Sequence, residues 1–213
     1  MKHYIIFDFN GTLLNDVELG LKLINEFLEY QHKPILDMDR YRHIFGFPIR
    51  DYYIRAGLDL NMDKFEELAV IYNERYMKES LSCKLYPEVW GLLTWLHDNG
   101  YYLICLSSSE INNLSFQLGY YKIRGLFDKI IGTSTIEGGS KKELGYEFIK
   151  NNNINPDEVI CIGDSLHDCE VADLIGCDYL LYTKGHQHPD FFKGHKTIDN
   201  LEEVKEYLWD FSK

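Results

Sequence analysis

Short apolar runs that end in polar residues recur along the chain. The clearest are Tyr4–Phe7 before Asp8, Tyr101–Leu106 before Ser107, and Glu158–Ile162 before Gly163-Asp164. Apolar runs of this length, bounded by turn residues, are typical of strands buried on both faces of a parallel sheet.

Helical periodicity separates these runs in the second half of the chain. We expect a helix after Pro87 and others at Ile111–Leu118, Lys141–Asn151, Cys169–Leu174 and from Leu201, with further strands at Lys129–Gly132, Asp178–Tyr182 and Thr197-Ile198. Alternation of strands and helices predicts an α/β fold, a doubly wound parallel sheet with right-handed crossovers.

Residues 17–83 interrupt this alternation. Helical patterns follow one another there, at Val17–Tyr30, Asp37–Ile44, Arg50–Ala56 and Asp63–Leu81, and Asn15-Asp16 precedes the first as a candidate cap. A crossover between parallel strands usually carries a single helix. We therefore predict a discontinuous core domain, residues 1–16 and 84–213, with an inserted helical domain at 17–83.

The composition limits the partners. A net charge of −12 argues against nucleic acids and anionic membranes, which need a basic surface. Phosphate ligands remain open, because a bound cation can reverse the local field. The five cysteines form no CxxC pair, and no apolar run has the length of a signal peptide or membrane span. We expect a cytoplasmic protein, monomer or homodimer, without nucleic acid or membrane partners.

Carboxylates gather at one edge of the predicted sheet. Asp8 and Asp164 follow strands, and Asp168 lies one helical turn after Asp164. The carboxyl ends of parallel strands meet at one edge, where α/β folds bind ligands. Carboxylates this close would repel one another, and Mg²⁺, which takes oxygen ligands, would relieve the repulsion.

The neighbouring polar residues extend this chemistry. Ser107 ends another strand and can donate its hydroxyl to a phosphate oxygen, while Lys141 or Lys142 opens a helix. A metal, a hydroxyl and a lysine around a carboxylate suit phosphoryl transfer, with Asp8 able to act as the nucleophile.

These residues resemble the motifs of the haloacid dehalogenase superfamily of phosphohydrolases. The first motif, Asp-x-Asp-Gly-Thr, resembles Asp8–Thr12 except that Asn10 replaces the second aspartate. The second falls on Ser107, the third on Lys141 or Lys142, and the fourth, Gly-Asp-Ser-x-x-Asp, on Gly163–Asp168. We favour Lys141, because Leu144 then faces inward. Four motifs in order cover essentially the whole chain.

The resemblance implies a Rossmann-like core with the helical cap of the phosphoglycolate phosphatase-like branch. It implies a Mg²⁺-dependent phosphatase acting on a small phosphorylated metabolite. The segment Gly46–Arg50 resembles the cap loop that meets the substrate, which makes Arg50 a candidate specificity contact.

The resemblance also implies individual roles. Asp8 would be the nucleophile, and the metal ligands would be Asp8, the main-chain carbonyl of Asn10, Asp164 and Asp168 as ligand or orienting group. The phosphate would be held by Ser107, Lys141 and backbone N–H groups near Gly11 and Ser108.

Asn10 departs from the family pattern. The aspartate expected there protonates the leaving group and then activates water, which is worth about 10²–10⁴-fold in rate. Three hypotheses follow: a preference for good leaving groups such as acyl or aryl esters, a proton from another side chain such as His43, or a catalytically impaired protein that binds a phosphoryl ligand in a regulatory role.

Simpler interpretations compete with several assignments. Arg50 reads more readily as a surface salt-bridge residue, and His167 as a partly exposed helix residue. The segment Gly185–Pro189 with His195 invites a zinc site, but its spacing favours a polar loop. A receiver-type signalling domain is disfavoured by the helical insert and by the fourth motif.

Overall fold

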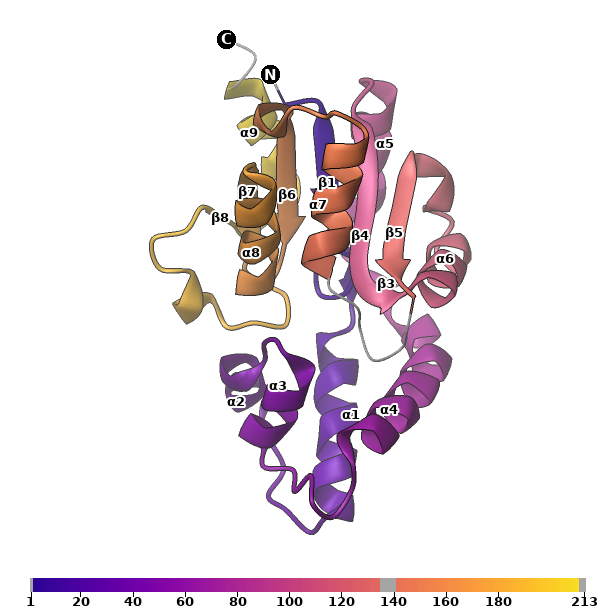
Figure 1. Ribbon diagram of the computed structural model, residues 1–213, viewed down its shortest axis with the longest axis vertical. Helices are drawn as coiled ribbons and strands as arrows, with labels where there is room; N and C mark the ends of the chain where they lie inside the picture. Colours follow the sequence, from indigo (N-terminus) through magenta and orange to yellow (C-terminus); the bar gives the residue numbers. More distant parts are fainter. Residues whose placement is uncertain (1, 135–140, 211–213) are drawn as a thin grey trace.

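The computed structural model describes residues 2–134 and 141–210 of the chain. A six-stranded sheet lies at its centre, and all its neighbouring strands pair in parallel (Figure 1). The strand order is β5 (Lys129–Thr133), β4 (Tyr102–Glu110), β1 (Tyr4–Phe7), β6 (Val159–Gly163), β7 (Asp178–Tyr182) and β8 (Thr197–Ile198). This arrangement confirms the predicted fold class and makes β1 a central strand.

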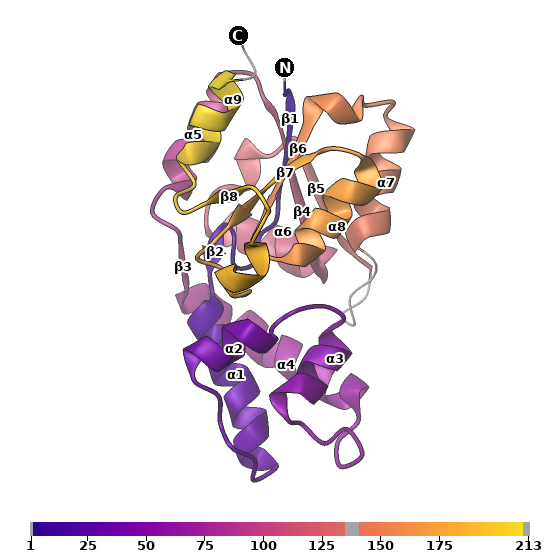
Figure 2. The ribbon, with the colours of Figure 1, turned by 90° about the vertical axis from the view of Figure 1, so that its left-hand side faces the viewer.

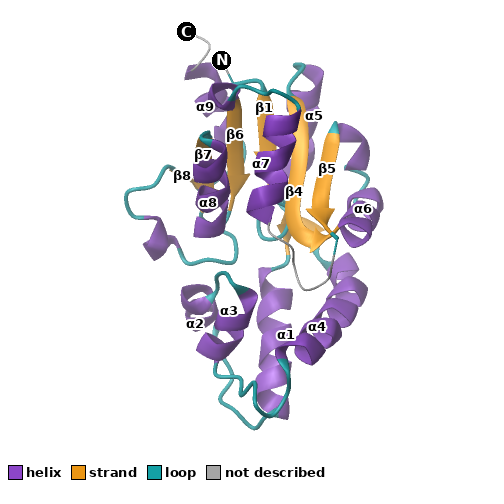
Figure 3. Cartoon of the chain, in the orientation of Figure 1, coloured by secondary structure: helices purple, strands orange, loops and turns teal. Residues whose placement is uncertain are grey.

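Helices cover both faces of the sheet (Figure 3). Alternate side chains of β1 point to opposite faces, so Ile5 and Phe7 belong to one hydrophobic cluster and Ile6 to another. The first cluster includes α5 (Val89–Asp98), α6 (Ile111–Tyr120) and α9 (Glu203–Asp210), and the second includes α7 (Lys141–Asn151) and α8 (Leu166–Ile175).

A separate group of helices lies beyond the carboxyl ends of the strands (Figure 2). It consists of α1 (Val17–Tyr30), α2 (Met38–Ile44), α3 (Ile49–Ala56) and α4 (Phe65–Glu79). These helices pack around their own cluster, which includes Ile24, Leu28, Tyr41 and Tyr53. The separate cluster supports the division at residues 16/17 and 83/84, which stays a prediction. We call residues 17–83 the cap.

A short antiparallel ribbon joins the cap to the core. Strand β2 (Leu14–Asn15) pairs with β3 (Lys84–Leu85), so the two connections run side by side. The sequence did not predict this pairing, because two-residue strands carry no readable periodicity.

Several element boundaries differ from the sequence prediction for local reasons. Strand β4 continues past Leu106 to Glu110, with a register irregularity against β5. Helix α8 begins at Leu166 rather than Cys169, because Ser165 and Asp168 form a capping box. Short 3₁₀ turns occupy Ser80–Ser82, Arg124–Leu126, Pro156–Glu158 and Pro189–Phe192.

Two further properties concern the protein's surroundings. Within residues 2–134 and 141–210, no helix has both the length and the apolar content needed to cross a membrane. All five cysteines fall in the described part of the chain, and all are free thiols.

Candidate active site

Asp8 and Asp164 lie side by side at the carboxyl edge of the sheet. Asp8 follows β1 and Asp164 follows β6, and the Asp8 N–H donates to the Ile162 carbonyl across 2.9 Å. Asp168 adds a third carboxylate from the first turn of α8. Each of the three is at most 9% exposed. The predicted carboxylate cluster is therefore present in the structure.

Lys141 bridges this cluster. Its Nζ donates to Asp8 Oδ1 across 2.5 Å and to Asp168 Oδ1 across 2.6 Å. The neighbouring Lys142 instead donates to Glu170 Oε2 across 3.0 Å. The geometry thus favours Lys141 over Lys142 as the lysine of the site.

The carboxylates are packed against bare backbone. A Cβ atom on Gly11 would overlap the Asp164 carboxylate, and one on Gly163 would overlap Asp168. Gly11 also has φ of 73°, a left-handed conformation that favours glycine. The Asp164 carboxylate is further held by Thr12 Oγ1 at 3.0 Å and by the His186 N–H at 2.6 Å.

Burial of these charges shifts their pKa values. Burial raises the pKa of Asp8 to about 8, although the Lys141 ammonium opposes the rise and the carboxylates of Asp168 and Asp164 add to it. Burial also raises the pKa of Asp164, to about 6. Burial acts the same way on Asp168, but the Lys141 ammonium outweighs it, so the pKa of Asp168 falls below its usual value.

The donor set fits a magnesium ion. Asp8, Asp164 and Asp168 offer oxygen atoms only, the ligand type that Mg²⁺ prefers. The Lys141 ammonium contacts Asp8 and Asp168, but its single charge does not balance three ionised carboxylates in one buried cluster. A divalent cation there would favour the ionised form of Asp8.

Both polar atoms of the Asn10 side-chain amide are hydrogen-bonded. Its Oδ1 accepts from Ser109 Oγ at 3.0 Å and, at 3.4 Å, from Ser107 Oγ. Its Nδ2 donates to Asp16 Oδ2 at 3.0 Å and to the Tyr76 hydroxyl oxygen at 2.5 Å. Since Tyr76 belongs to α4, these bonds connect the core to the cap.

Asp16 is the main residue that the sequence prediction misassigned. It directly precedes α1, as predicted, but its side chain makes no capping hydrogen bond. Both carboxylate oxygens point instead into the site and accept from Gly11 N, Asn10 Nδ2, Tyr76 O–H and His186 Nε2. The side chain lies buried because the Gly11 turn and the cap surround it.

His186 completes this buried network. Its Nε2 lies 3.2 Å from Asp16 Oδ1, and its Nδ1 lies 2.7 Å from the Tyr41 hydroxyl. Burial acts to lower the pKa of His186, but the Asp16 carboxylate raises it above its usual value. Burial acts to raise the pKa of Asp16, and the charge of His186 lowers it below the usual range.

A cavity of about 680 Å³ opens between the cap and the carboxylates. The predicted site residues that line it are Asp8, Asn10, Arg50, Ser107, Ser108, Lys141, Asp164 and Asp168. Arg50 also lies 3.7 Å from Glu66, so both interpretations of this residue have a basis in the structure. His167 contributes to the lining and stacks on Phe47 with ring centroids 4.3 Å apart.

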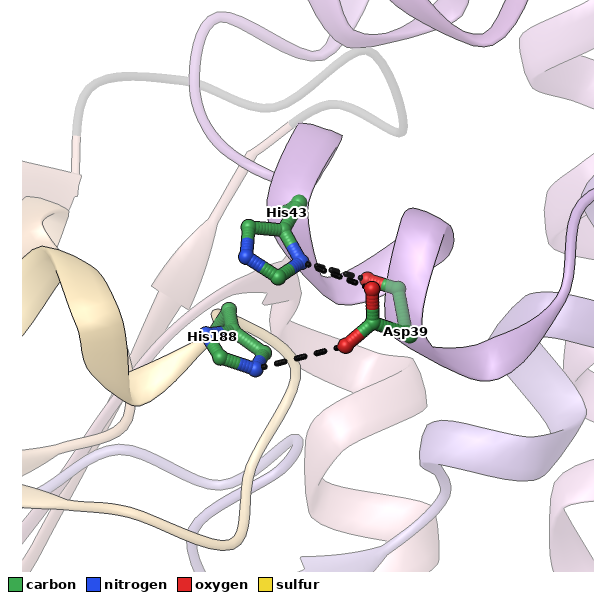
Figure 4. Close-up of side chains that lie close together, drawn as sticks. All are labelled: Asp39, His43 and His188. Carbon is green, nitrogen blue, oxygen red and sulfur yellow. Dashed lines mark hydrogen bonds and ion pairs between the residues drawn. The ribbon is translucent and has the colours of Figure 1, made fainter.

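His43 lies elsewhere, in a contact between the cap and the core (Figure 4). It stacks on His188 with ring centroids 3.7 Å apart, and Asp39 lies beside both rings. The His43 Nδ1 donates to the Asp39 carbonyl, and the His188 Nδ1 accepts from the Asp190 N–H. His43 is not among the residues that line the cavity, which leaves the suggestion of a proton from His43 without geometric support.

The histidines considered for zinc do not converge. His186 contacts Asp16, His188 contacts His43, and His195 lies 2.8 Å from the Tyr179 hydroxyl through its Nδ1. The segment after β7 is thus a loop whose histidines serve different contacts.

Residues 5–182 match the family described as haloacid dehalogenase-like hydrolase. The chain belongs to this family. Membership agrees with Asp8 and Asp164 at strand ends, with Ser107 directly after the apolar part of β4, and with the helical cap. It confirms the resemblance inferred from the motifs.

The individual relatives of this chain are distant. A phosphoglycolate phosphatase of Aliivibrio fischeri is 22% identical over 194 residues, covering 86% of this chain and 85% of its own. The tyrosine-protein kinase PtkA of Mycobacterium tuberculosis is 25% identical over 210 residues, covering 94% and 71%. A haloacid dehalogenase-like hydrolase structure from Streptococcus pneumoniae superposes with a TM-score of 0.82 at 22% identity, covering 97% of this chain and 98% of that one.

Proposed function

We propose that the protein is a Mg²⁺-dependent phosphatase that hydrolyses a small phosphorylated metabolite through a phosphoryl group on Asp8. One observation carries the proposal: Lys141 Nζ bonds both Asp8 and Asp168 at the floor of the cavity. An ammonium so placed orients the nucleophile and offsets the charge of an incoming phosphate. Relatives named phosphoglycolate phosphatases support the reaction class.

Asp8 is the proposed nucleophile, and rigid elements hold it in place. Its N–H is tied to β6 and its carboxylate to Lys141, so the second oxygen can be presented to phosphorus. The Ser107 hydroxyl and the backbone N–H of Ser108 would hold the phosphate oxygens. Positioning and charge stabilisation dominate phosphoryl transfer, so such a set suffices for the first step.

The proposed metal ligands are Asp8, the main-chain carbonyl of Asn10, Asp164 and Asp168. The ion would supply positive charge for the phosphate oxygens and for the ionised Asp8. Thr12 and the His186 N–H fix one ligand, Asp164, and Ser165 fixes Asp168.

A second candidate is a phosphoryl-binding protein with little turnover. Its basis is Asn10, whose amide carries no exchangeable acid proton and is held by Ser109, Asp16 and Tyr76. Binding of metal and phosphate does not need an acid at residue 10, because these roles fall to other groups.

The test is a panel of phosphorylated metabolites assayed with Mg²⁺ on the wild type, Asn10→Asp and Asp8→Asn. A phosphatase gives turnover that Asp8→Asn abolishes, and a gain in Asn10→Asp would locate the deficit at residue 10. Phosphate binding without turnover that depends on Asp8 would favour the second candidate.

A further inference from the structure

Aromatic side chains form the cap wall of the cavity. Those lining it are Phe45, Phe47, Tyr52, Tyr53, Phe65, Tyr72 and Tyr76. Four of these, Phe45, Phe47, Phe65 and Tyr72, are only half-buried, although Phe45 stacks one face on His186 and Phe47 one face on His167. A wall of this kind holds a flat apolar group well, through burial and ring stacking.

Cationic groups are scarce on the same wall. Among the described lining residues of the cap, Arg50 is the one cation, and its side chain is 56% exposed and paired with Glu66. It also lies over the Phe65 ring at 6.0 Å. The described cap residues of the cavity thus include no buried cation. A substrate that carries a second negative group besides the phosphate, such as a carboxylate, would find no buried partner for that group on this wall.

The side chains nearest residue 10 are committed to one another. Asp16 accepts from Gly11, Asn10, Tyr76 and His186, which fills the roughly four lone-pair sites of a carboxylate. Both ring nitrogens of His186 are engaged, with Asp16 and with Tyr41. The described neighbours of Asn10 therefore offer no evident replacement for the missing acid.

A leaving group that departs without a proton must be a weak base. A phenol has a pKa of about 10, as in tyrosine, whereas an aliphatic alcohol is a far weaker acid. The carboxylate of an acyl phosphate is also a good leaving group, but a small acyl group would make no contact with the aromatic wall. The aromatic lining of the cap and the absence of an acid at residue 10 are independent observations. Both favour esters of a phenol.

We propose that the cavity takes aryl phosphate monoesters, with the phosphate at Asp8 and the aromatic ring against the cap. This inference rests on the proposed phosphatase function and names its substrate class. An Asp8 oxygen forms a bond to phosphorus, and the bond from phosphorus to the aryl oxygen breaks. Its electron pair leaves on the phenolate, which takes a proton from water.

The second half of the reaction restores the enzyme. Water attacks the phosphorus, the bond between phosphorus and the Asp8 oxygen breaks, and its electron pair returns to the carboxylate. The proton released by this water balances the one taken by the phenolate. The products are a phenol and inorganic phosphate.

Three esters separate the two parts of the proposal. Phenyl phosphate has both a ring and a good leaving group, benzyl phosphate has the ring but an alkoxide leaving group, and acetyl phosphate has a good leaving group without a ring. With Mg²⁺, we expect kcat/KM for phenyl phosphate to exceed that for benzyl phosphate by about 10²–10⁴-fold, because kcat/KM includes the step in which the alcohol leaves but not the later attack of water. Acetyl phosphate should turn over with a KM at least about tenfold higher than phenyl phosphate, since it leaves the aromatic wall unused.

Two variants assign these effects to residues. Asn10→Asp should raise kcat/KM for benzyl phosphate at least tenfold and change kcat/KM for phenyl phosphate much less. Phe47→Leu should raise KM for phenyl phosphate and the inhibition constant of phenylphosphonate, without changing those of acetyl phosphate and methylphosphonate. The matched control is Phe116→Leu, on α6 and 57% exposed, which should change none of these values.

The outcomes separate the preference for aryl esters from the proposed phosphatase function on which it rests. Equal kcat/KM for phenyl and benzyl phosphate in the wild type would overturn the aryl preference, as would a higher kcat/KM for a short aliphatic phosphate. In both cases turnover lost in Asp8→Asn would leave the phosphatase function standing. Absence of any turnover that depends on Asp8 would overturn both.

Discussion

Asn10 Nδ2 donates to Asp16 Oδ2 across 3.0 Å, so the amide that replaces the expected acid is bonded to a buried carboxylate. Tyr76 bonds both residues from the cap. This pair therefore ties residue 10 to the cap, because Tyr76 belongs to α4.

Asp16→Asn should lower the stability of the protein. An asparagine keeps the shape but replaces one acceptor oxygen with an NH₂ donor. In one orientation this donor would face the donors of Asn10 and Tyr76. In the other it would face those of Gly11 and His186. Breaking a buried pair of this kind costs about 3–5 kcal/mol. Urea unfolding measures it, with the surface variant Glu66→Gln, 61% exposed, as the control. An unchanged urea midpoint in Asp16→Asn would contradict the network.

His186 should make stability depend on pH. The pKa of His186 is raised in the folded state from 6.5, so the folded protein holds this proton more tightly than the unfolded chain does. The stabilisation is complete below about pH 6.5 and is lost as pH rises through the folded pKa. The difference in unfolding free energy between the wild type and His186→Gln should therefore shrink from pH 6 to 9, measured with saturating Mg²⁺.

The control for this measurement is His97→Gln, a half-exposed histidine on α5. This variant also exchanges a histidine for glutamine but leaves the contact between His186 and Asp16 in place. A difference for His186→Gln that is constant or grows with pH would exclude the proposed pairing with Asp16.

Lys141 and Lys142 should differ sharply in importance. Lys141→Met removes the ammonium that contacts Asp8 and Asp168, and we expect kcat/KM to fall by about 10²–10³-fold. Lys142 also lines the cavity, but its Nζ contacts Glu170 and not the carboxylate cluster, so kcat/KM of Lys142→Met should stay within about threefold. Comparable losses in both variants would show that the assignment of Lys141 is wrong.

Mg²⁺ should stabilise the folded protein through Asp164. At a concentration about 100-fold above the dissociation constant, the stabilisation is about 2.7 kcal/mol, visible as a rise in Tm. Asp164→Asn should lose most of this rise, whereas Asp98→Asn, 69% exposed on α5 and outside the cavity lining, should keep it. A full Mg²⁺ response in Asp164→Asn would place the metal elsewhere.

The sequence predicted the positions of those site residues that depend on local secondary structure. Asp8, Ser107 and Asp164 follow apolar runs, and a parallel sheet brings the ends of these runs to one edge, although β4 itself continues past Ser107 to Glu110. Lys141 opens a helix whose predicted bounds agree with those of α7. In these cases the local pattern and the topology rule determine the place of the side chain.

The network around Asn10 could not be predicted in this way. Asp16, Tyr76 and His186 come from the start of α1, from α4 and from the loop after β7, and only the packing of cap on core brings them together. An aspartate directly before a helix normally caps it, so the sequence predicted a capping role for the Asp16 side chain, which is wrong. Glycines at 11 and 163 were the available hint that side chains pack tightly there.

The most direct test of the proposed mechanism is to trap the phosphoryl group on Asp8. The wild type is mixed with phenyl phosphate and Mg²⁺, quenched in acid during turnover, digested and examined by mass spectrometry. We expect a phosphorylated peptide with the modification at Asp8, and none from Asp8→Asn or from samples without substrate. Turnover with an unmodified Asp8 peptide, or undiminished turnover by Asp8→Asn, would contradict the central claim.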